Sequence, residues 1–276
     1  MEKEVIGVDE QKRILLEILQ KMHNICEANG INYYLGYGTL LGAVRHGGFI
    51  PWDDDIDIWM FREEYDKLAS LFESKEDEYE RSYNLKLINA YNSNGYYAHM
   101  AKVYDTRTYL IENVIQSIPI GSYVDIFVID YLSNDKELAY KLTKSLKKYR
   151  RVLDAKNVKL SKERKMYKNW ILLIGRIAFK LINRNWILRK LDTKAQKYAM
   201  LTDSKYCGAV SAQVYFEKEV FLTEWFAEKE LLSFEDSSFW CPKRYDEILE
   251  RLYGNYMELP PEEKREKRHE NIVYWR

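Results

Sequence analysis

Residues 36–58 read GYGTLLGAVRHGGFIPWDDDIDI, and the end of this stretch decides the fold. Asp55 and Asp57 alternate there with Ile56 and Ile58. Side chains in a β-strand alternate between two faces, so the pattern predicts a strand with both isoleucines in a core and both aspartates together on the opposite face. Two carboxylates on one face repel each other unless a cation lies between them. Their oxygens suit Mg²⁺ or Mn²⁺, and such sites leave positions for substrate phosphates.

The glycines before the acidic run indicate a site for phosphate. Gly36, Gly38 and Gly42 surround Thr39, and a short helix is predicted from Leu40 to Arg45. Small residues let a ligand approach the backbone, and the N–H groups at the start of a helix attract anions. The alternative is that these glycines only form a turn.

The acidic run also matches half of a calcium-binding EF-hand loop. Asp53, Asp55 and Asp57 take the first ligand positions, and Glu64 falls at the twelfth. The sixth position of such a loop should be glycine, but here it is Ile58. The Ile-Asp-Ile alternation therefore favours a strand over a calcium loop.

A third carboxylate, Asp125, lies within the run YVDIFVID at residues 123–130. This β-branched and aromatic run predicts a core strand, in which a bare charge is costly. Asp125 is therefore expected to be paired or bound to a metal, although a strand-edge aspartate facing water is the alternative. Asp130 is expected to begin the next turn.

Together, a glycine turn, an Asp-x-Asp strand and a third acid on a neighbouring strand form the arrangement of the nucleotidyltransferase fold. The string GTLLGAVRHGGFIPWDDDIDI, with YGNYMELPPEEKR near the C-terminus, resembles the LicD family of phosphocholine transferases, to which fukutin-like enzymes are related. The similarity covers residues 8–130 and about 200–276. It implies an α+β fold, with a mixed and mainly antiparallel sheet flanked by helices.

The resemblance also implies roles for individual residues. Asp55 and Asp57 match the metal-binding pair, Gly38 and Thr39 match the phosphate-side turn, and Asp125 matches the third carboxylate, which completes the metal site or accepts a proton. Asp53 and Asp54 are electrostatic candidates. Basic residues are expected to bind the donor phosphates; the candidates are Arg45, His46, Lys102, Arg107 and, from the family pattern, His269. The alternative for each is a surface cation.

The implied reaction moves phosphocholine from CDP-choline to a hydroxyl of a cell-surface glycan or teichoic-acid precursor, with a divalent metal, Mg²⁺ or Mn²⁺. Choline has no N–H group to donate and is best held over aromatic rings. The candidates near the motif are Tyr33, Tyr34, Tyr37, Trp52, Trp59, Tyr96 and Tyr97, although most buried aromatic residues only build a core. Two further alternatives remain: the same fold with CDP-ribitol or a nucleoside triphosphate as donor, and an inactive nucleotide-binding or membrane adaptor.

Basic and acidic residues are distributed unevenly along the chain. The 276 residues have a formal net charge of zero, but residues 136–190 contain 18 Lys or Arg against 3 Asp or Glu. Within them, the segment from Trp170 to Trp186 has Arg176, Lys180 and Arg184 at helical spacing among apolar residues. These charges exclude a membrane span, but the segment could lie in a membrane interface. The alternative is a core helix with one solvated basic stripe. No nucleic-acid motif accompanies the charge.

The sequence predicts three regions in the chain. Residues 1–135 are the predicted nucleotidyltransferase-like core, 136–200 a basic helical insertion, and 201–276 a C-terminal segment that completes the active site. Local signals predict helices at 9–29 and 245–253, each ended by glycine, and a charged tail helix after Pro260-Pro261.

Three cysteines without Cys-x-x-Cys spacing argue against disulfides and structural zinc. With no apolar signal segment, we expect a cytoplasmic enzyme, in contact with the inner membrane face through residues 170–190.

Overall fold

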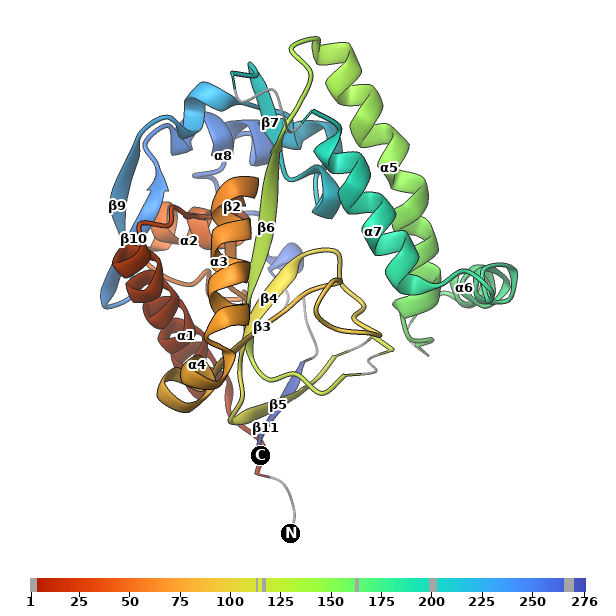
Figure 1. Cartoon of the computed structure of the whole chain (residues 1–276), viewed down its shortest axis with the longest axis horizontal. Coiled ribbons are helices and arrows are strands. Elements are labelled where there is room, and N and C mark those ends of the chain that lie inside the picture. The colour runs from red at the N-terminus through yellow and green to blue at the C-terminus, as the bar shows by residue number, and fades with distance from the viewer. Residues whose placement is uncertain (1–3, 113, 116–117, 162–163, 199–202, 266–270) are drawn as a thin grey trace.

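The computed structural model describes residues 4–112, 114–115, 118–161, 164–198, 203–265 and 271–276. A mixed sheet forms the centre of the molecule (Figure 1). Its strands, in spatial order, are β1 (Tyr34–Leu35), β2 (Asp57–Phe61), β6 (Tyr123–Tyr131), β4 (Ala101–Asp105) and β3 (Leu85–Ile88). Strands β2 and β6 are parallel, while the other neighbours along this path are antiparallel. The predicted α+β class, with a mainly antiparallel sheet, is confirmed.

Two short strands extend this sheet at the C-terminal end of β6. β7 (Tyr206–Gly208) pairs with β6, and β8 (Phe221–Leu222) pairs with β7, both antiparallel. Outside the main sheet, β9 (Lys229–Phe234) and β10 (Ser237–Pro242) form a hairpin next to β1, and β5 (Thr108–Ile111) pairs with β11 (Ile272–Trp275). The C-terminal quarter of the chain therefore packs on the same core as the first half.

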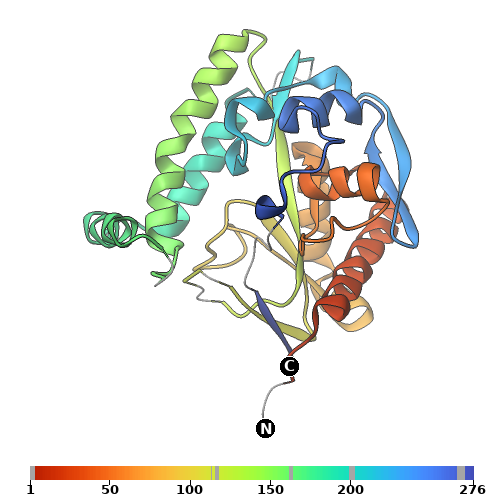
Figure 2. The ribbon, with the colours of Figure 1, turned by 180° about the vertical axis from the view of Figure 1, so that it is seen from behind.

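Helices cover both faces of the sheet. α3 lies in front of β2 and β6 in Figure 1, whereas α2 and α8 come to the front in the reverse view (Figure 2). The helices are α1 (Val8–Asn29), α2 (Tyr37–His46), α3 (Arg62–Ser74), α4 (Glu76–Tyr83), α5 (Lys136–Asn157), α6 (Met166–Ala178), α7 (Arg184–Ala195) and α8 (Tyr245–Tyr253).

Glycines end three of these helices as their sequences predict. Gly30 and Gly47 follow α1 and α2 in the left-handed conformation, which glycine adopts without a steric cost. Gly254, also at positive φ, ends α8. The predicted opening helix and the predicted helix at 245–253 are confirmed.

The C-terminal tail departs from its prediction. Among the described residues after Pro260-Pro261, Glu262–Lys264 form a 3₁₀ turn and Ile272–Trp275 form β11. The residues of β11 are Ile-Val-Tyr-Trp, which favour a strand, and Val273 is buried opposite Leu110 of β5. The prediction of a tail helix is therefore wrong for the described residues, and the rest of it, at 266–270, lies outside the described residues.

The basic insertion consists of α5, α6 and α7, between β6 and β7. The alternative of a core helix from Trp170 to Trp186 is wrong in two respects. α6 ends at Ala178 and α7 begins at Arg184, and none of the 13 residues of α6 is buried. Figures 1 and 2 both show α6 projecting sideways from the rest of the molecule.

Across the part of the chain that the structure describes, no helix combines the length and the apolar character that crossing a membrane requires.

Candidate active site

Asp57 and Asp125 lie opposite each other on the parallel strands β2 and β6. Asp57 begins β2, and its N–H donates to Thr39 Oγ1 at 2.8 Å. The N–H of Asp125 donates to the carbonyl oxygen of Ile56 at 2.9 Å. Ile56 and Ile58 are fully buried, whereas Asp55 and Asp57 are partly exposed. The predicted alternation of faces is therefore observed, although Asp55 lies just before the strand.

The glycine turn holds these carboxylates in place. A Cβ atom on Gly38 would lie 2.6 Å from Asp53 Oδ2, so glycine makes room for the Asp53 carboxylate at the first turn of α2. This end of a helix carries a partial positive charge that stabilises an acid. Thr39 is buried, and its hydroxyl accepts from the backbone of Asp57. Both residues thus contact the acidic loop, and their predicted contact with phosphate stays a prediction.

Burial, followed by the crowding of carboxylates, sets the electrostatics of the cluster. Desolvation raises the pKa of Asp57 well above its ordinary value, and the charges of Asp55, Asp125 and Asp53 raise it further. Burial likewise raises the pKa of Asp125 to about 6, although the Lys102 ammonium opposes the rise. A cation beside these groups would favour their ionised forms.

Lys102 is the basic candidate that the structure brings to this cluster. It is buried in β4 opposite Asp125, and its Nζ donates to Asp125 Oδ1 at 2.6 Å. The same Nζ lies 3.3 Å from the centroid of the Tyr123 ring, and the Tyr123 hydroxyl donates to Glu112 Oε1 at 2.6 Å. Lys102 is therefore a buried partner of Asp125 rather than a surface cation.

The donor set fits a hard divalent cation held partly by substrate. Asp55 and Asp57 offer carboxylate oxygens, and their mutual repulsion is the kind that such a cation relieves. Within the described ranges, no three His, Cys, Asp or Glu side chains form a finished metal centre. This agrees with the Lys102 ammonium occupying one side of Asp125. Two carboxylates that leave positions for phosphate oxygens match the coordination that Mg²⁺ prefers.

Arg45 and His46 lie at the other end of α2 from this cluster, about 10 Å from Thr39 along the helix axis. Arg45 Nη1 donates to the carbonyl of Tyr256 at 2.7 Å, and its Nε donates to His46 Nε2 at 3.0 Å. The His46 ring lies edge-on to Trp52, with centroids 6.3 Å apart. Burial lowers the pKa of His46, as does Arg45. Arg45 thus fixes the end of α2 to the C-terminal segment.

Arg107 and Asp130 do not join the cluster. Arg107 Nη2 lies 2.6 Å from Asp105 and 2.8 Å from Glu17 of α1, so two acids already balance its charge. Asp130 was expected to begin a turn, and this is wrong. It is buried within β6, where Arg62 donates to both of its oxygens at 2.8 Å and supplies the compensating charge. The remaining basic candidate, His269, lies outside the described residues.

Most of the aromatic candidates belong to the core. Six of the seven are buried: Tyr33, Tyr34, Tyr37, Trp59, Tyr96 and Tyr97. Trp52 is partly exposed and directly precedes the buried Asp53, and the Arg265 guanidinium lies 5.8 Å from its ring. Of these seven, Trp52 is therefore the one with a partly exposed side chain, and its ring lies beside His46 and Arg265.

Glu219 is a residue at the site that sequence reasoning missed. It is fully buried, and the Tyr37 hydroxyl donates to its Oε2 at 2.6 Å. The backbone N–H groups of Val214 and Tyr215 donate to its other oxygen. Burial raises the pKa of Glu219 to about 7, although these hydrogen bonds oppose the rise. Glu219 thus ties the start of α2 to the C-terminal segment, and nothing in its local sequence indicates this.

A mixed sheet with paired aspartates on parallel strands, next to a glycine-containing helix start, defines the nucleotidyltransferase class of fold. The family model described as "LicD/FKTN/FKRP, nucleotidyltransferase domain" matches residues 30–114. The lipopolysaccharide cholinephosphotransferase LicD of Haemophilus influenzae is 33% identical over 272 residues, which cover 96% of this chain and 97% of that protein. The chain belongs to the LicD family, as its two motifs predicted, and is a transferase.

Shorter similarities to other proteins cover about a quarter of this chain or less. The human ribitol 5-phosphate transferase FKRP is 44% identical over 52 residues, which cover 19% of this chain and 10% of that protein. An uncharacterized protein of Rickettsia prowazekii is 40% identical over 76 residues, covering 26% of this chain and 29% of that protein.

Proposed function

We propose that this enzyme transfers phosphocholine from CDP-choline to a hydroxyl of a cell-surface glycan, either a lipopolysaccharide or a teichoic-acid precursor, and releases CMP. The observation that carries the proposal is the similarity over nearly the whole of both chains to a lipopolysaccharide cholinephosphotransferase. The Asp57–Asp125 pair supports it. Phosphoryl transfer needs positive charge beside the donor phosphates, and carboxylates at this position could hold a divalent cation there.

The proposed reaction exchanges one P–O bond for another. The acceptor oxygen attacks the phosphorus of phosphocholine, the bond from that phosphorus to the bridging oxygen breaks, and CMP leaves with both electrons. Asp55 and Asp57 would hold Mg²⁺ or Mn²⁺, which would balance phosphate charge when bound. Asp125 takes the acceptor's proton, since burial raises its pKa to about 6, and Lys102 orients that carboxylate. The protein otherwise positions the reactants.

We propose Trp52 as a contact of the choline head group. A quaternary ammonium binds aromatic faces, and Trp52 is the partly exposed aromatic residue beside the acidic loop. Replacing Trp52 should weaken the binding of CDP-choline more than that of CMP, because CMP has no choline. Calorimetric titration of a Trp52→Leu variant with both ligands tests this assignment, and equal losses for the two ligands would remove Trp52 from the choline site.

CDP-ribitol is the second candidate donor. It is favoured by the 44% identity over 52 residues to a ribitol 5-phosphate transferase. The two donors share the nucleotide and differ in the group attached to the outer phosphate, so the same carboxylates would serve both. Their discrimination would then depend on side chains around that outer phosphate, such as Trp52.

The wider organisation follows the sequence proposal. Residues 1–135 provide the catalytic core, 136–200 the basic insertion and 201–276 the segment that completes the site, which the Tyr37–Glu219 hydrogen bond supports. We place the reaction in the cytoplasm, at the inner face of the membrane. The three cysteines support this, since all are buried free thiols, as suits a reducing compartment.

The deciding experiment is calorimetric titration with CDP-choline, CDP-ribitol and CTP, each with and without Mg²⁺. Tight binding of CDP-choline that requires Mg²⁺ and disappears in an Asp57→Asn variant is expected. A preference for CDP-ribitol would replace the donor and keep the site. Absence of binding for all three would favour the adaptor alternative. Release of CMP in the presence of a glycan acceptor then tests the transfer itself.

A further inference from the structure

Helix α6 turns its apolar side toward solvent. Five large residues lie on one face of it, because each has another of the five three or four positions away, and a sixth follows just beyond the end of the helix. They expose between 57% and 97% of their surface. These residues, which we name the α6 stripe, are Tyr167, Trp170, Ile171, Ile174, Ile177 and Leu181. A helix on the surface of a globular protein normally buries such a face, so this orientation needs a partner.

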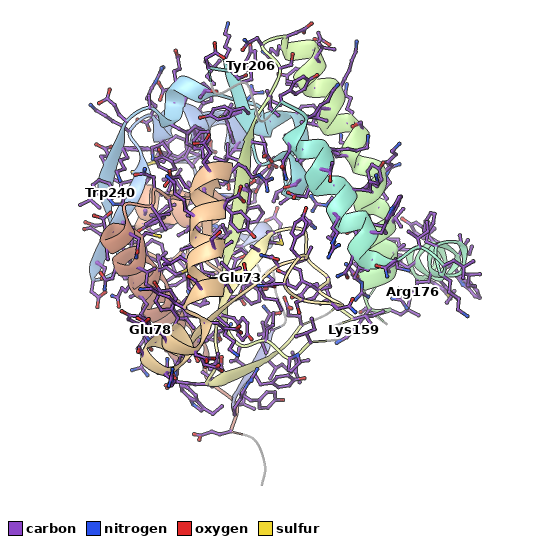
Figure 3. The ribbon with its side chains drawn as sticks, viewed as in Figure 1. Glu73, Glu78, Lys159, Arg176, Tyr206 and Trp240 are labelled. Carbon is purple, nitrogen blue, oxygen red and sulfur yellow. The ribbon has the colours of Figure 1, made fainter. Side chains whose placement is uncertain are left out.

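The opposite side of α6 fixes this orientation. Gly175 packs so closely on α5 that a Cβ there would lie 2.9 Å from Ala155 Cβ. Arg176 Nε donates to the carbonyl of Ala155 at 3.1 Å, and its Nη2 donates to the carbonyl of Val158. Figure 3 labels Arg176 where α6 meets the foot of α5. A small residue and an arginine thus anchor the helix, and the α6 stripe points away from the anchor.

An apolar hollow continues this surface where α6 is followed by α7. It has a volume of about 400 Å³ and lies against α5. Its lining includes Val152, Phe179, Ile182 and Trp186, together with Lys148 and Arg151. Two bases beside an apolar hollow match the two parts of an anionic lipid, a charged head group and an acyl chain.

Charge distinguishes the possible occupants of the α6 stripe. Lys165, Lys168 and Lys180 are exposed beside it, and residues 136–190 carry an excess of 15 basic over acidic residues, 18 against 3. A second copy of this chain would bring a like charge to the contact, which is repulsive. A membrane with anionic lipids brings the complementary charge, and Trp170 and Tyr167 suit its interface.

We propose that the α6 stripe inserts into the surface of a membrane that contains anionic lipids, with the neighbouring lysines at the head groups. α6 would lie in the plane of the interface, since it is too short to cross the membrane. This inference deepens the proposed function, which places the enzyme at the inner face of the membrane, because it names the contacting surface and the class of lipid. It depends on no donor, acceptor or metal, and it would hold if the donor were CDP-ribitol.

Flotation of the whole protein with vesicles tests the proposal. One set contains phosphatidylcholine and phosphatidylglycerol in equal parts, and the other contains phosphatidylcholine alone. The test variant is Ile174→Asp/Ile177→Asp, whose positions are exposed and tolerate the change in the fold. The matched control is Leu231→Asp, at an exposed leucine of the β9–β10 hairpin on another part of the molecule. An Asp57→Asn variant shows whether the active site holds the phosphatidylcholine head group instead.

We expect binding to the anionic vesicles that the α6 double variant loses by roughly tenfold or more, while Leu231→Asp and Asp57→Asn retain it. Equal binding by the double variant and the wild type would overturn the proposal, as would loss of binding only in Asp57→Asn. Analytical ultracentrifugation adds a further test. A wild-type dimer that the double variant converts to a monomer would assign the stripe to self-association, and would also overturn it. Calorimetry with CDP-choline reports the proposed function separately from all these outcomes.

Discussion

Asp57 and Asp125 are opposed residues in the parallel ladder between β2 and β6, so the sheet itself brings their backbones within about 4.8 Å. Neither carboxylate depends on a mobile loop for its position. The backbone N–H of each also donates into this corner of the fold, to Thr39 and to Ile56. The site is therefore rigid before any substrate arrives, at the cost of holding like charges together.

Asp57→Asn should stabilise the metal-free protein while lowering turnover by several orders of magnitude. Burial and the neighbouring carboxylates raise the pKa of Asp57, so the folded protein disfavours its ionised form, and the amide removes that cost. Thermal unfolding with and without Mg²⁺ checks this. Mg²⁺ should raise the Tm of the wild type and of a Glu73→Gln control on the exposed side of α3, but not that of Asp57→Asn. An equal Mg²⁺ effect on Asp57→Asn would contradict the metal assignment.

Lys102→Met should lower the free energy of unfolding by about 3–5 kcal/mol, because it leaves the buried Asp125 without its partner. Adding Asp125→Asn should restore much of that loss, since the pair is then removed together. Urea unfolding of the two single variants and the double variant measures the coupling. Strictly additive losses would show that the 2.6 Å contact contributes nothing to stability.

Thr39→Val should cost about 1–3 kcal/mol and reduce activity, because the N–H of Asp57 loses its acceptor at a buried position. Thr39→Ser keeps the hydroxyl and serves as the matched control. Unfolding and CMP release should change together in the valine variant and stay near wild type in the serine variant. If valine and serine behave alike, the hydroxyl does not position Asp57.

Glu219→Gln should flatten the pH dependence of stability. The wild-type pKa is raised from 4.5 to about 7, so between these values the folded protein keeps a proton that the unfolded chain has released. Wild-type stability therefore falls as pH rises through this window, by on the order of 3 kcal/mol from this group. The free energy of unfolding, measured at pH 5 and pH 8, should fall between these values in an exposed Glu250→Gln control but not in Glu219→Gln. A similar fall in both variants would assign it to other groups.

Local patterns in the sequence predicted much of the fold. The alternation of Ile56 and Ile58 with acids, and the glycines that end α1 and α8, depend on neighbours within a few residues, and these predictions are confirmed. The long glycine and aspartate motif was specific enough to identify the family. The predicted tail helix is absent from the described residues at the C-terminus, where β11 pairs with β5, a strand more than 150 positions earlier in the sequence.

The roles of charged residues were less predictable, because they depend on register. Lys102 and Arg107 are five residues apart, yet β4 places Lys102 opposite Asp125, while Arg107 lies in the turn beyond Asp105. Asp130 is held within β6 by Arg62, which comes from α3. Glu219 reaches Tyr37 across 182 positions of sequence. Each outcome follows from contacts that only the assembled sheet defines.

The basic insertion leaves the sheet after Tyr131 and returns at Tyr206, and the strands on either side of it, β6 and β7, are direct neighbours. In topological terms it occupies the place of a hairpin loop. Its length and composition can therefore change over evolution without shifting the register that aligns Asp57 with Asp125. An exchange of this one segment would change the surface that α6 presents and leave in place the strands that carry Asp57 and Asp125.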